Sequence, residues 1–525
     1  MIGILRGTPL KKSYAPAKIA KIKNPELIIG LVGPIGVDLD LVFEQLSAQL
    51  KNVEYNSHLV KITDILTNPP FLIKIDNRSY TKRYLSLISE ADRICKEYGS
   101  ADFLARLSIA NIREIRKGIT GSYVEPALGN AYIIRQLKRE AEVDLLKRVY
   151  GRKFILVSVF LNEKNRREEL IKKISSYDAT ATNDDENVIE ATELMSRDAQ
   201  EENEEHGQEV SLIFHRGDVF VDGANRTAIE RTISRFVSAL FGHNGISPNR
   251  NEYGMYAAAG AALRSIDLSR QVGAAIFSQK GEVISLGCNE VPRAFGGTYW
   301  ADDIPDSHRD FEEGIDANHF HKTVIIKDLV DRLCDSKVIN STWAKKLRNS
   351  SGFRSLINLD SIKKSKAMDI IEFGRMIHAE MSAITDAARI GRSTKDAVLF
   401  CTTFPCHMCA KHIVAAGIKK VVFLEPYPKS YAKKLHSDSI TFEPSESDKK
   451  VYFEPFLGIS PRRYRDIFEK SKRKDKQGKS LDWYEQYPFP RIDDSSASYI
   501  EIEDGEVLPR MFLIKKIKRK KDSVS

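Results

Sequence analysis

The chain has 525 residues, of which 42% are hydrophobic and 29% are charged, and its formal net charge is +9. This length and composition predict a soluble globular protein with two or more domains. No apolar run approaches the roughly 18 residues of a membrane span, and the opening Met-Ile-Gly-Ile-Leu-Arg is too short for a signal sequence. We therefore expect a cytoplasmic protein with no membrane partner, whose six cysteines form no disulfide framework.

The first pattern along the chain is a short apolar strand at 27–33 that runs into a glycine-rich turn and then an amphipathic helix. The glycines are Gly30, Gly33 and Gly36. A strand, a glycine turn and a helix present backbone N–H groups to phosphate. A phosphate-binding loop, however, continues as G-x-x-x-x-G-K-[ST]. In the alignment that starts at Gly33, the last three of these positions hold Asp38, Leu39 and Asp40.

Five basic residues follow in the same half of the chain: Arg135, Lys138, Arg139, Arg166 and Arg167. They resemble the phosphate-contacting and lid residues of nucleoside-monophosphate kinases. The resemblance implies a three-layer kinase-like domain at 24–242 that can bind a second nucleotide or Mg²⁺. A nucleotide-binding or regulatory relic is favoured over an active kinase, because the missing Lys removes a central contact of phosphoryl transfer. Solvated charges on a helix face are the alternative. The acidic stretch 184–205 is expected to form a helical excursion or lid.

The second half opens with two predicted strands, 269–276 and 283–287, joined by a tight turn. The loop after them, Gly-Cys-Asn-Glu-Val-Pro, contains Asn289. Residues 293–370 then interrupt the pattern with an insertion that we expect beside a ligand pocket, where it selects the ligand or acts as a gate. The insertion also contains three residues that offer either a second metal site or ordinary surface and core positions. These are His319, His321 and Cys334.

The most informative residues are His378, Glu380, Cys406 and Cys409, which stand as H-A-E and, after a gap, P-C-H-M-C. One imidazole and two thiolates form a tetrahedral zinc site whose fourth corner is open to water, which is the catalytic arrangement. If Pro405 opens a helix, both sulfurs lie on one face near its positive dipole end. His378 and Glu380 are two apart at the start of another helix and point in different directions. The imidazole can therefore bind the metal while Glu380 carries protons.

The surrounding sequence predicts helix, strand, helix and strand, with strands at 396–403 and 420–424 and a cap at Gly391. This order brings both sets of ligands to one end of a sheet. A closed zinc knuckle that uses His407 or His412 is the alternative, but neither residue shares the face and turn of the two cysteines.

The H-x-E and P-C-x-x-C signature is that of the zinc nucleobase deaminases. Residues 250–290 and 370–465 resemble the deoxycytidylate deaminase branch of the cytidine deaminase superfamily. The resemblance implies a three-layer α/β/α domain with a mixed sheet at 250–470. It also implies substrate contacts by Asn289 to the sugar, by Tyr427 to the base, and by Arg375. A loop Asn that bonds its own backbone and a Tyr used in packing are the alternatives.

Longer stretches resemble the bacterial anti-phage dCTP deaminases, which join a P-loop-like front half to a deaminase rear half. These stretches are 30–36, 142–151, 217–222, 375–381 and 456–464. The resemblance implies zinc-dependent hydrolytic deamination of free deoxycytidine nucleotides, dCTP, dCMP or both, which deprives a phage of DNA precursors. It also implies a homo-oligomer and an inhibitory RNA.

Residues 471–525 are expected to form an extension that ends in the basic run 515–521, either as a solvated end or as an RNA-binding tail. Three other functions stay open. A housekeeping dCMP deaminase and a tRNA or single-stranded DNA base deaminase share the zinc motif. A sensor or scaffold would keep the fold without turnover.

Overall fold

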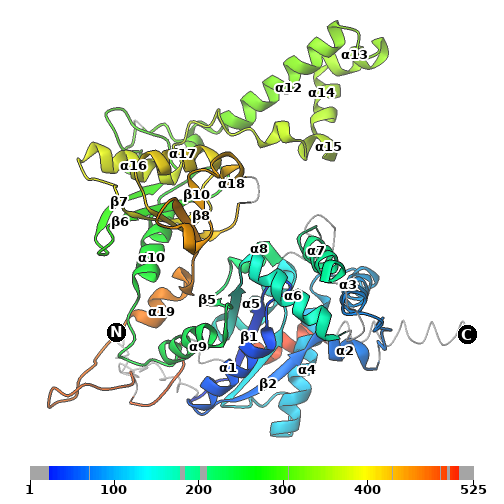
Figure 1. Cartoon of the computed structure of the whole chain (residues 1–525), viewed down its shortest axis with the longest axis vertical. Coiled ribbons are helices and arrows are strands. Elements are labelled where there is room, and N and C mark those ends of the chain that lie inside the picture. Colours follow the sequence, from blue (N-terminus) through cyan, green and yellow to red (C-terminus); the bar gives the residue numbers. More distant parts are fainter. Residues whose placement is uncertain are drawn as a thin grey trace, which may run out of the picture. The chain divides into compact units, whose positions relative to one another are not determined.

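The computed structural model describes residues 23–69, 71–177, 184–200, 210–305, 307–427, 430–484, 486–492 and 497–507. The chain divides into two compact units (Figure 1). Unit 1 contains residues up to 210, residues 223–245 and residues from 470 onward, and unit 2 contains 211–222 and 246–469. The basic run 515–521 lies outside the described residues. No helix in the described part of the chain is long and apolar enough to cross a membrane.

Unit 1 is built on four parallel strands in the order β4-β1-β3-β2. They are β1 (Leu27–Val32), β2 (Asn56–Lys61), β3 (Asn130–Arg135) and β4 (Phe154–Phe160). β1 is buried along its whole length, as expected for a continuous apolar run covered on both faces.

Helices surround this sheet, with α1 packed against α9 and α4 packed against α5. Their bounds are α1 (Leu39–Lys51), α2 (Ile62–Thr67), α3 (Tyr80–Glu97), α4 (Phe103–Thr120), α5 (Glu140–Tyr150), α6 (Glu163–Tyr177), α7 (Asp184–Gln200) and α9 (Arg226–Leu240). α7 covers most of the acidic stretch that was expected to be helical, and residues 201–205 lie outside the described residues.

The C-terminal extension packs within unit 1 through helical residues 499–507. Glu503 is fully buried and its Oε1 accepts from Nη2 of Arg116 at 2.9 Å. Arg116 also donates through Nε to Glu26, at 3.0 Å, and Tyr499 donates to the same carboxylate. A buried guanidinium is thus shared by two carboxylates from opposite ends of the sequence, which fixes this helix to unit 1.

Unit 2 contains a mixed sheet in the order β10-β11-β9-β8-β6-β7. β10, β11, β9 and β8 are parallel, and β8, β6 and β7 are antiparallel. The bounds are β6 (Gly273–Phe277), β7 (Val283–Cys288), β8 (Val398–Thr403), β9 (Lys420–Glu425), β10 (Ile440–Thr441) and β11 (Val451–Pro455). β6 and β7 form the predicted hairpin.

Helices cover both faces of this sheet, so unit 2 has the expected α/β/α layers (Figure 1). They are α10 (Arg250–Ala262) on one face and α16 (Ala379–Arg389) and α17 (His407–Ala415) on the other. Strand alternation separates the two cores, because Ala274 and Ile276 pack toward α16 and α17 while Ala275 and Phe277 pack toward α10.

Two of the stretches that carry the anti-phage resemblance lie side by side in unit 2. β5 (Val219–Asp222), which follows α8 (Val210–Phe214), pairs antiparallel with β12 (Gly458–Ile459). Asp218, next to β5, receives a hydrogen bond from Nε of Arg463 at 3.0 Å. α19 (Tyr464–Phe468) follows this strand pair along the chain, and α18 (Ala432–Leu435) packs against α17 and β10.

The insertion is helical and has a small core of its own. Its helices are α11 (Asp310–Glu313), α12 (Ala317–Asp335), α13 (Ser341–Arg348), α14 (Ser350–Ile357) and α15 (Asp360–Lys363). The core residues are Ile326, Val330, Cys334, Leu347 and Phe353. Cys334 therefore serves packing, which agrees with the ordinary core alternative stated for it.

Candidate active site

Three side chains of unit 2 converge on one point. Among the residues that the structure describes, His378, Cys406 and Cys409 are the only group of three or more His, Cys, Asp or Glu whose ligand atoms all lie within 4.8 Å of one another. Nδ1 of His378 is 3.3 Å from Sγ of Cys406 and 3.4 Å from Sγ of Cys409. Ligands of one tetrahedral zinc ion are about 3.6 Å apart for these atom types. The donor set therefore fits a zinc ion with three protein ligands.

The alternatives for the metal are resolved by this grouping. A closed knuckle needs a fourth His or Cys at the same point, and within the described residues neither His407 nor His412 belongs to the group. The second metal site considered for the insertion, with His319 and His321, is likewise absent from the described residues.

Both ligand segments begin helices. His378 is the N-cap of α16 and Cys406 is the N-cap of α17, where its Sγ accepts from the backbone N–H of Cys409 at 3.4 Å. The prediction that Pro405 opens the second helix is wrong, because the helix begins at His407 and Cys406 itself provides the cap. The consequence for the sulfurs is unchanged, since both lie at the positive end of the helix dipole.

A glycine sets the distance between α16 and the sheet. A Cβ atom at Gly287 of β7 would lie 2.2 Å from the carbonyl oxygen of Ala379 and 2.5 Å from the backbone nitrogen of Ala383. Only glycine lets the strand pass this close to the first turn of the helix. The close approach fixes the turn that contains Glu380 and follows His378.

The three ligands share protons in a way that favours thiolate at Cys406 and thiol at Cys409. A hydrogen bond from Cys409, together with the neighbouring His378, lowers the pKa of Cys406 to about 4. The hydrogen bond to Cys406 raises the pKa of His378 to about 9, and the pKa of Cys409 is raised because its thiol donates to Cys406. A dication at this point replaces the shared proton and deprotonates a coordinating thiol outright.

Glu380 lies beside the ligands but outside their group. Its side chain is 4% exposed, and burial raises the pKa of its carboxyl group. A carboxyl group whose pKa moves toward neutrality is suited to accept and release a proton. Its role as proton carrier stays a prediction, and its position agrees with that role.

A cavity of 330 Å³ leads to the ligands. Its lining includes Asn289 and Tyr427, two of the three residues predicted to contact substrate. The third, Arg375, is not among the described lining residues, and its guanidinium instead donates to Asp310 at 2.9 Å and to the carbonyl oxygen of His308 at 3.0 Å.

Several lining residues were missed by the sequence reasoning, among them Asn318, Ile371 and Arg270. Asn318 lies in the first turn of α12, and Ile371 follows the insertion, so the insertion borders the cavity as expected for a pocket-side segment. Arg270 precedes β6. No local pattern indicates that Asn318 and Ile371 reach the cavity, but an Arg within the matched stretch before β6 was a signal that the prediction did not use.

Asn289 ties the loop after β7 to the segment before β6. Its Oδ1 accepts from the backbone N–H of Val272 at 2.7 Å, and its Nδ2 donates to the carbonyl oxygen of Arg270 at 2.8 Å. Nδ2 also lies 3.7 Å from the sulfur of Met376, a weak acceptor that a sugar hydroxyl can replace. Asn289 therefore combines the backbone-bonding alternative with a remaining capacity to bind a hydroxyl.

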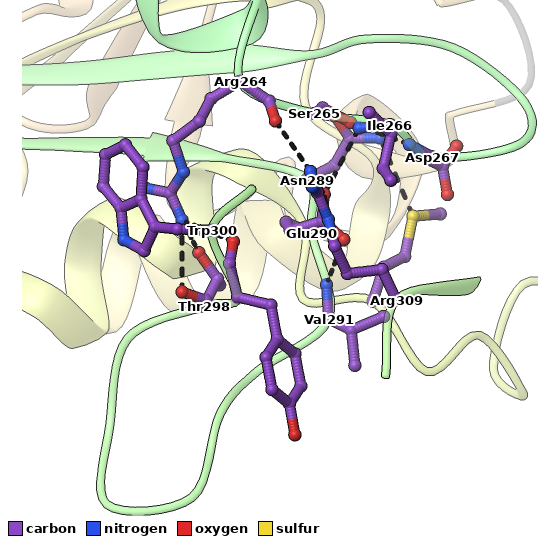
Figure 2. A network of polar contacts seen from close by, with 12 residues as sticks. Arg264, Ser265, Ile266, Asp267, Asn289, Glu290, Val291, Thr298, Trp300 and Arg309 are labelled. Atoms are coloured by element: carbon purple, nitrogen blue, oxygen red, sulfur yellow. Dashed lines mark hydrogen bonds and ion pairs between the residues drawn. The ribbon is translucent and has the colours of Figure 1, made fainter. Parts of the chain in front are cut away.

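Behind Asn289 lies a buried ion pair that joins the insertion to the site (Figure 2). Oε2 of Glu290 accepts from Nη2 and Nε of Arg309 at 2.7 and 3.0 Å, and both side chains are buried. The carbonyl oxygen of Glu290 accepts from the N–H of Ile377, which precedes His378, at 3.1 Å. One loop thus holds both the start of the insertion and the segment that carries the imidazole.

Arg264 extends this network toward the turn at Thr298 (Figure 2). Its guanidinium lies 3.8 Å from the ring centroid of Trp300, and its backbone carbonyl accepts from Nη2 of Arg309 at 3.1 Å. The cation–π contact and the hydrogen bonds stabilise the first residues of the insertion next to the loop.

The predicted nucleotide-binding residues of unit 1 divide into two sets. Gly30 lies within β1, and Gly33 and Gly36 follow it, Gly36 with φ +98°. None of these glycines is among the described residues that line the 420 Å³ cavity of unit 1, whereas Arg135 and Arg139 are.

The basic residues at this cavity have acidic partners within unit 1. Nε of Arg135 is 2.8 Å from Oδ1 of Asp40, which is one of the residues that replace the phosphate-binding motif. Nζ of Lys138 is 2.9 Å from Asp198, and Arg139 pairs with Asp92. The kinase-like assignment stays a prediction.

Comparison with known proteins identifies the middle of the chain. Residues 248–425 match the family described as the cytidine and deoxycytidylate deaminase zinc-binding region. This segment is therefore similar to the domain of that deaminase family. It includes both the H-A-E and the P-C-H-M-C segments and thus all three converging ligands.

Individual relatives match shorter stretches. ComE operon protein 2 of Bacillus subtilis (strain 168) is 39% identical over 79 residues, which are 15% of this chain and 42% of that protein. The deoxycytidylate deaminase of Enterobacteria phage T2 is 50% identical over 54 residues, 10% of this chain and 29% of that protein. The chain therefore spans less than half the length of either relative.

Among solved structures, the dCMP deaminase of cyanophage S-TIM5 in apo form aligns with 40% of this chain and 99% of its own, at 18% identity and a TM-score of 0.21.

Proposed function

We propose that unit 2 deaminates free deoxycytidine nucleotides, dCTP, dCMP or both, to deoxyuridine nucleotides and ammonia by hydrolysis. The observation that carries the proposal is the convergence of His378, Cys406 and Cys409 beside the buried Glu380, at the end of a 330 Å³ cavity. Cavities that enclose small-molecule ligands begin at about this volume. Three protein ligands are the set that would hold a catalytic zinc ion, which needs a further position for water or substrate.

The chain's own residues divide the chemistry between them. His378, Cys406 and Cys409 would hold a zinc ion, which would supply a Lewis acid that makes water nucleophilic near neutral pH. Glu380 removes a proton from the water that adds to C4 of the cytosine ring and delivers it to N3. The same carboxylate then takes the proton of the new C4 hydroxyl group and passes it to the exocyclic amine, which leaves as ammonia while the C4 carbonyl forms. Asn289 orients the sugar, and Tyr427 closes the cavity over the base.

A free nucleotide is favoured over a polynucleotide by the residues around the cavity. Asn318 and Ile371, at the two ends of the insertion's helical part, both border it. A strand that continued on both sides of the target base would have to pass these segments. From the resemblance to anti-phage dCTP deaminases we further propose that the enzyme depletes DNA precursors during phage infection, forms a homo-oligomer and is held inactive by an RNA.

The test is incubation of the purified, zinc-loaded protein with labelled dCTP, dCMP and a cytosine-bearing oligonucleotide. We expect deoxyuridine nucleotide from at least one of the two free nucleotides and none from the oligonucleotide. Product from the oligonucleotide alone would make the protein a polynucleotide deaminase. In infected cells, full phage protection by a Glu380→Ala variant would instead favour the sensor or scaffold alternative.

For unit 1 we propose that its cavity binds a second nucleotide, with or without Mg²⁺, in a regulatory role. The observation behind this proposal is that Arg135, Lys138 and Arg139 line a 420 Å³ cavity together with three tyrosines. These are Tyr80, Tyr84 and Tyr177. The basic side chains can bind the phosphate of a nucleotide, and the tyrosine rings can pack against its base. Equilibrium dialysis of the purified protein with labelled ATP and dCTP measures this binding.

A further inference from the structure

The substrate of the proposed reaction carries a charge that the cavity of unit 2 must accommodate. A phosphate monoester has a charge of about −1.5 to −2 near pH 7. The inner end of the cavity is unsuited to it, because Glu380 and Cys406 there are acidic groups that are 4% and 6% exposed. The amino group of the base must approach these same residues. The phosphate must therefore lie toward the open end.

Arg270 lies at that open end. Its side chain is 41% exposed, and among the described residues that line the cavity it is the only Lys or Arg. The acidic residues of the lining, Asp267 and Glu380, would otherwise leave a dianion without a positive group. A guanidinium is planar, permanently charged and able to bind phosphate with two parallel hydrogen bonds.

Arg270 is held in place by three neighbours. Nδ2 of Asn289 donates to its carbonyl oxygen at 2.8 Å, which fixes its backbone. Its guanidinium lies 5.4 Å from the ring centroid of Tyr427, and its Nη1 donates to Oε1 of Glu425 at 2.8 Å. Glu425 is the last residue of β9 and is partly exposed. A carboxylate at this distance occupies one of five N–H donors and stands in the place of an anionic ligand.

We propose that Arg270 binds the 5′-phosphate of the substrate and thereby restricts unit 2 to nucleotides over nucleosides. This inference rests on the proposed deamination of free deoxycytidine nucleotides and names the residue that recognises their charge. Asn289 and Tyr427 then act in part through Arg270, because one fixes its backbone and the other faces its guanidinium. Glu425 competes with the phosphate for the same donors.

The experiment compares dCMP with deoxycytidine as substrates of the full-length, zinc-loaded protein. For Arg270→Gln we expect the ratio of kcat/KM for dCMP to that for deoxycytidine to fall about 10- to 100-fold, the factor for a lost charge-assisted hydrogen bond. Arg270→Lys should restore part of the ratio, because an ammonium keeps the charge but loses the two-point geometry.

Glu425→Gln separates phosphate binding from a purely structural pair. If Glu425 competes with phosphate, its neutralisation lowers KM for dCMP, whereas loss of a structural ion pair weakens both substrates alike. Arg465→Gln is the matched control, since Arg465 is an exposed arginine of the same unit that pairs with Glu469 at 3.0 Å and does not line the cavity. We expect this variant to keep the wild-type ratio.

An unchanged substrate ratio in Arg270→Gln would overturn the role of Arg270. So would an equal loss for dCMP and deoxycytidine, or a raised KM for dCMP in Glu425→Gln. If the wild-type protein accepts dCTP but not dCMP, the same ratio is measured with dCTP. A wild-type protein that deaminates neither dCTP nor dCMP would instead contradict the proposed function itself, so the two failures are distinguishable.

Discussion

The cavities of the two units differ in how their charged side chains are used. In unit 1, Arg135 is paired with Asp40 and Lys138 with Asp198, so the basic residues already have partners from the same fold. In unit 2, His378 and the two cysteines converge on one point with the buried Glu380 beside them, and a cation is the partner that the geometry of the three donors suits. An ion pair fixes a side chain, but its charge is then partly neutralised and a ligand has to displace the partner. Donor atoms that converge on a point with no counter-ion bound there can bind a ligand directly.

The largest effect is expected when one of the three converging donors of unit 2 is removed. Cys406→Ala deletes a zinc ligand and the cap of α17 at once. We expect the purified variant to lose the metal and all measurable deamination, with local unfolding around the two helix N-termini. Metal analysis by mass spectrometry beside an activity assay measures both effects.

Cys401→Ala is the control for this prediction. Cys401 is a buried cysteine in the core of the same sheet and belongs to no ligand group among the described residues. We expect it to keep one zinc ion per chain. Retention of zinc and activity by Cys406→Ala would mean that the metal is bound elsewhere.

The second prediction separates proton transfer from metal binding. In Glu380→Gln the three ligands stay, so zinc content should equal that of the wild type, while kcat falls by about 10²- to 10⁴-fold, the contribution of general acid–base catalysis. Glu282→Gln, at an exposed turn, is a neutral control. A variant that binds zinc and turns over at the wild-type rate would assign the proton carrier to another group.

The third prediction concerns a pair in unit 2 whose charges are already matched. Arg309→Met leaves the buried carboxylate of Glu290 without its partner, which should destabilise the loop by about 3–5 kcal/mol. The double variant with Glu290→Gln should recover much of this loss, because no charge remains buried. Hydrogen exchange of residues 289–291 and 375–378 measures the local free energy of opening. Equal protection in the single and double variants would contradict the pairing.

The sequence predicts residues whose partners are near in the chain and misses those whose partners are distant. His378 and Glu380 are two residues apart, and the two cysteines are three apart, at the starts of helices that the flanking pattern indicates. These four residues could therefore be grouped before the fold was known. Arg309 meets Glu290 across the start of an insertion, and local periodicity carries no information on which buried cation meets which carboxylate. Arg375 shows the reverse case, since its motif was recognised but its guanidinium is bound to Asp310.

The C-terminal helix is a second case in which distant partners decide where a residue lies. The sequence predicted an extension at 471–525 without indicating what it packs against, and Glu503 lies in the interior of unit 1 beside Arg116. A Glu in a charged segment is ordinarily solvated. Only the buried guanidinium and the adjacent Glu26 show why this carboxylate is inside, and neither is near it in sequence.

The smallest effect is expected in unit 1, where removing the carboxylate of Asp40 leaves the guanidinium of Arg135 without this partner. Asp40 is exposed, and it pairs with Arg135 at a position where a phosphate-binding loop would place a hydroxyl residue. In Asp40→Asn the guanidinium loses a competing carboxylate, so the affinity for ATP should rise by up to about 5-fold, as for a partly screened surface pair of up to about 1 kcal/mol. Isothermal titration calorimetry compares the two proteins.

Glu44→Gln is the control, because Glu44 is on the same helix but pairs with Arg226, which does not line the cavity. Equal affinities in wild type and Asp40→Asn would show that Asp40 does not hold Arg135 back from an anion, and that the pairing of charges in unit 1 is not what limits binding there.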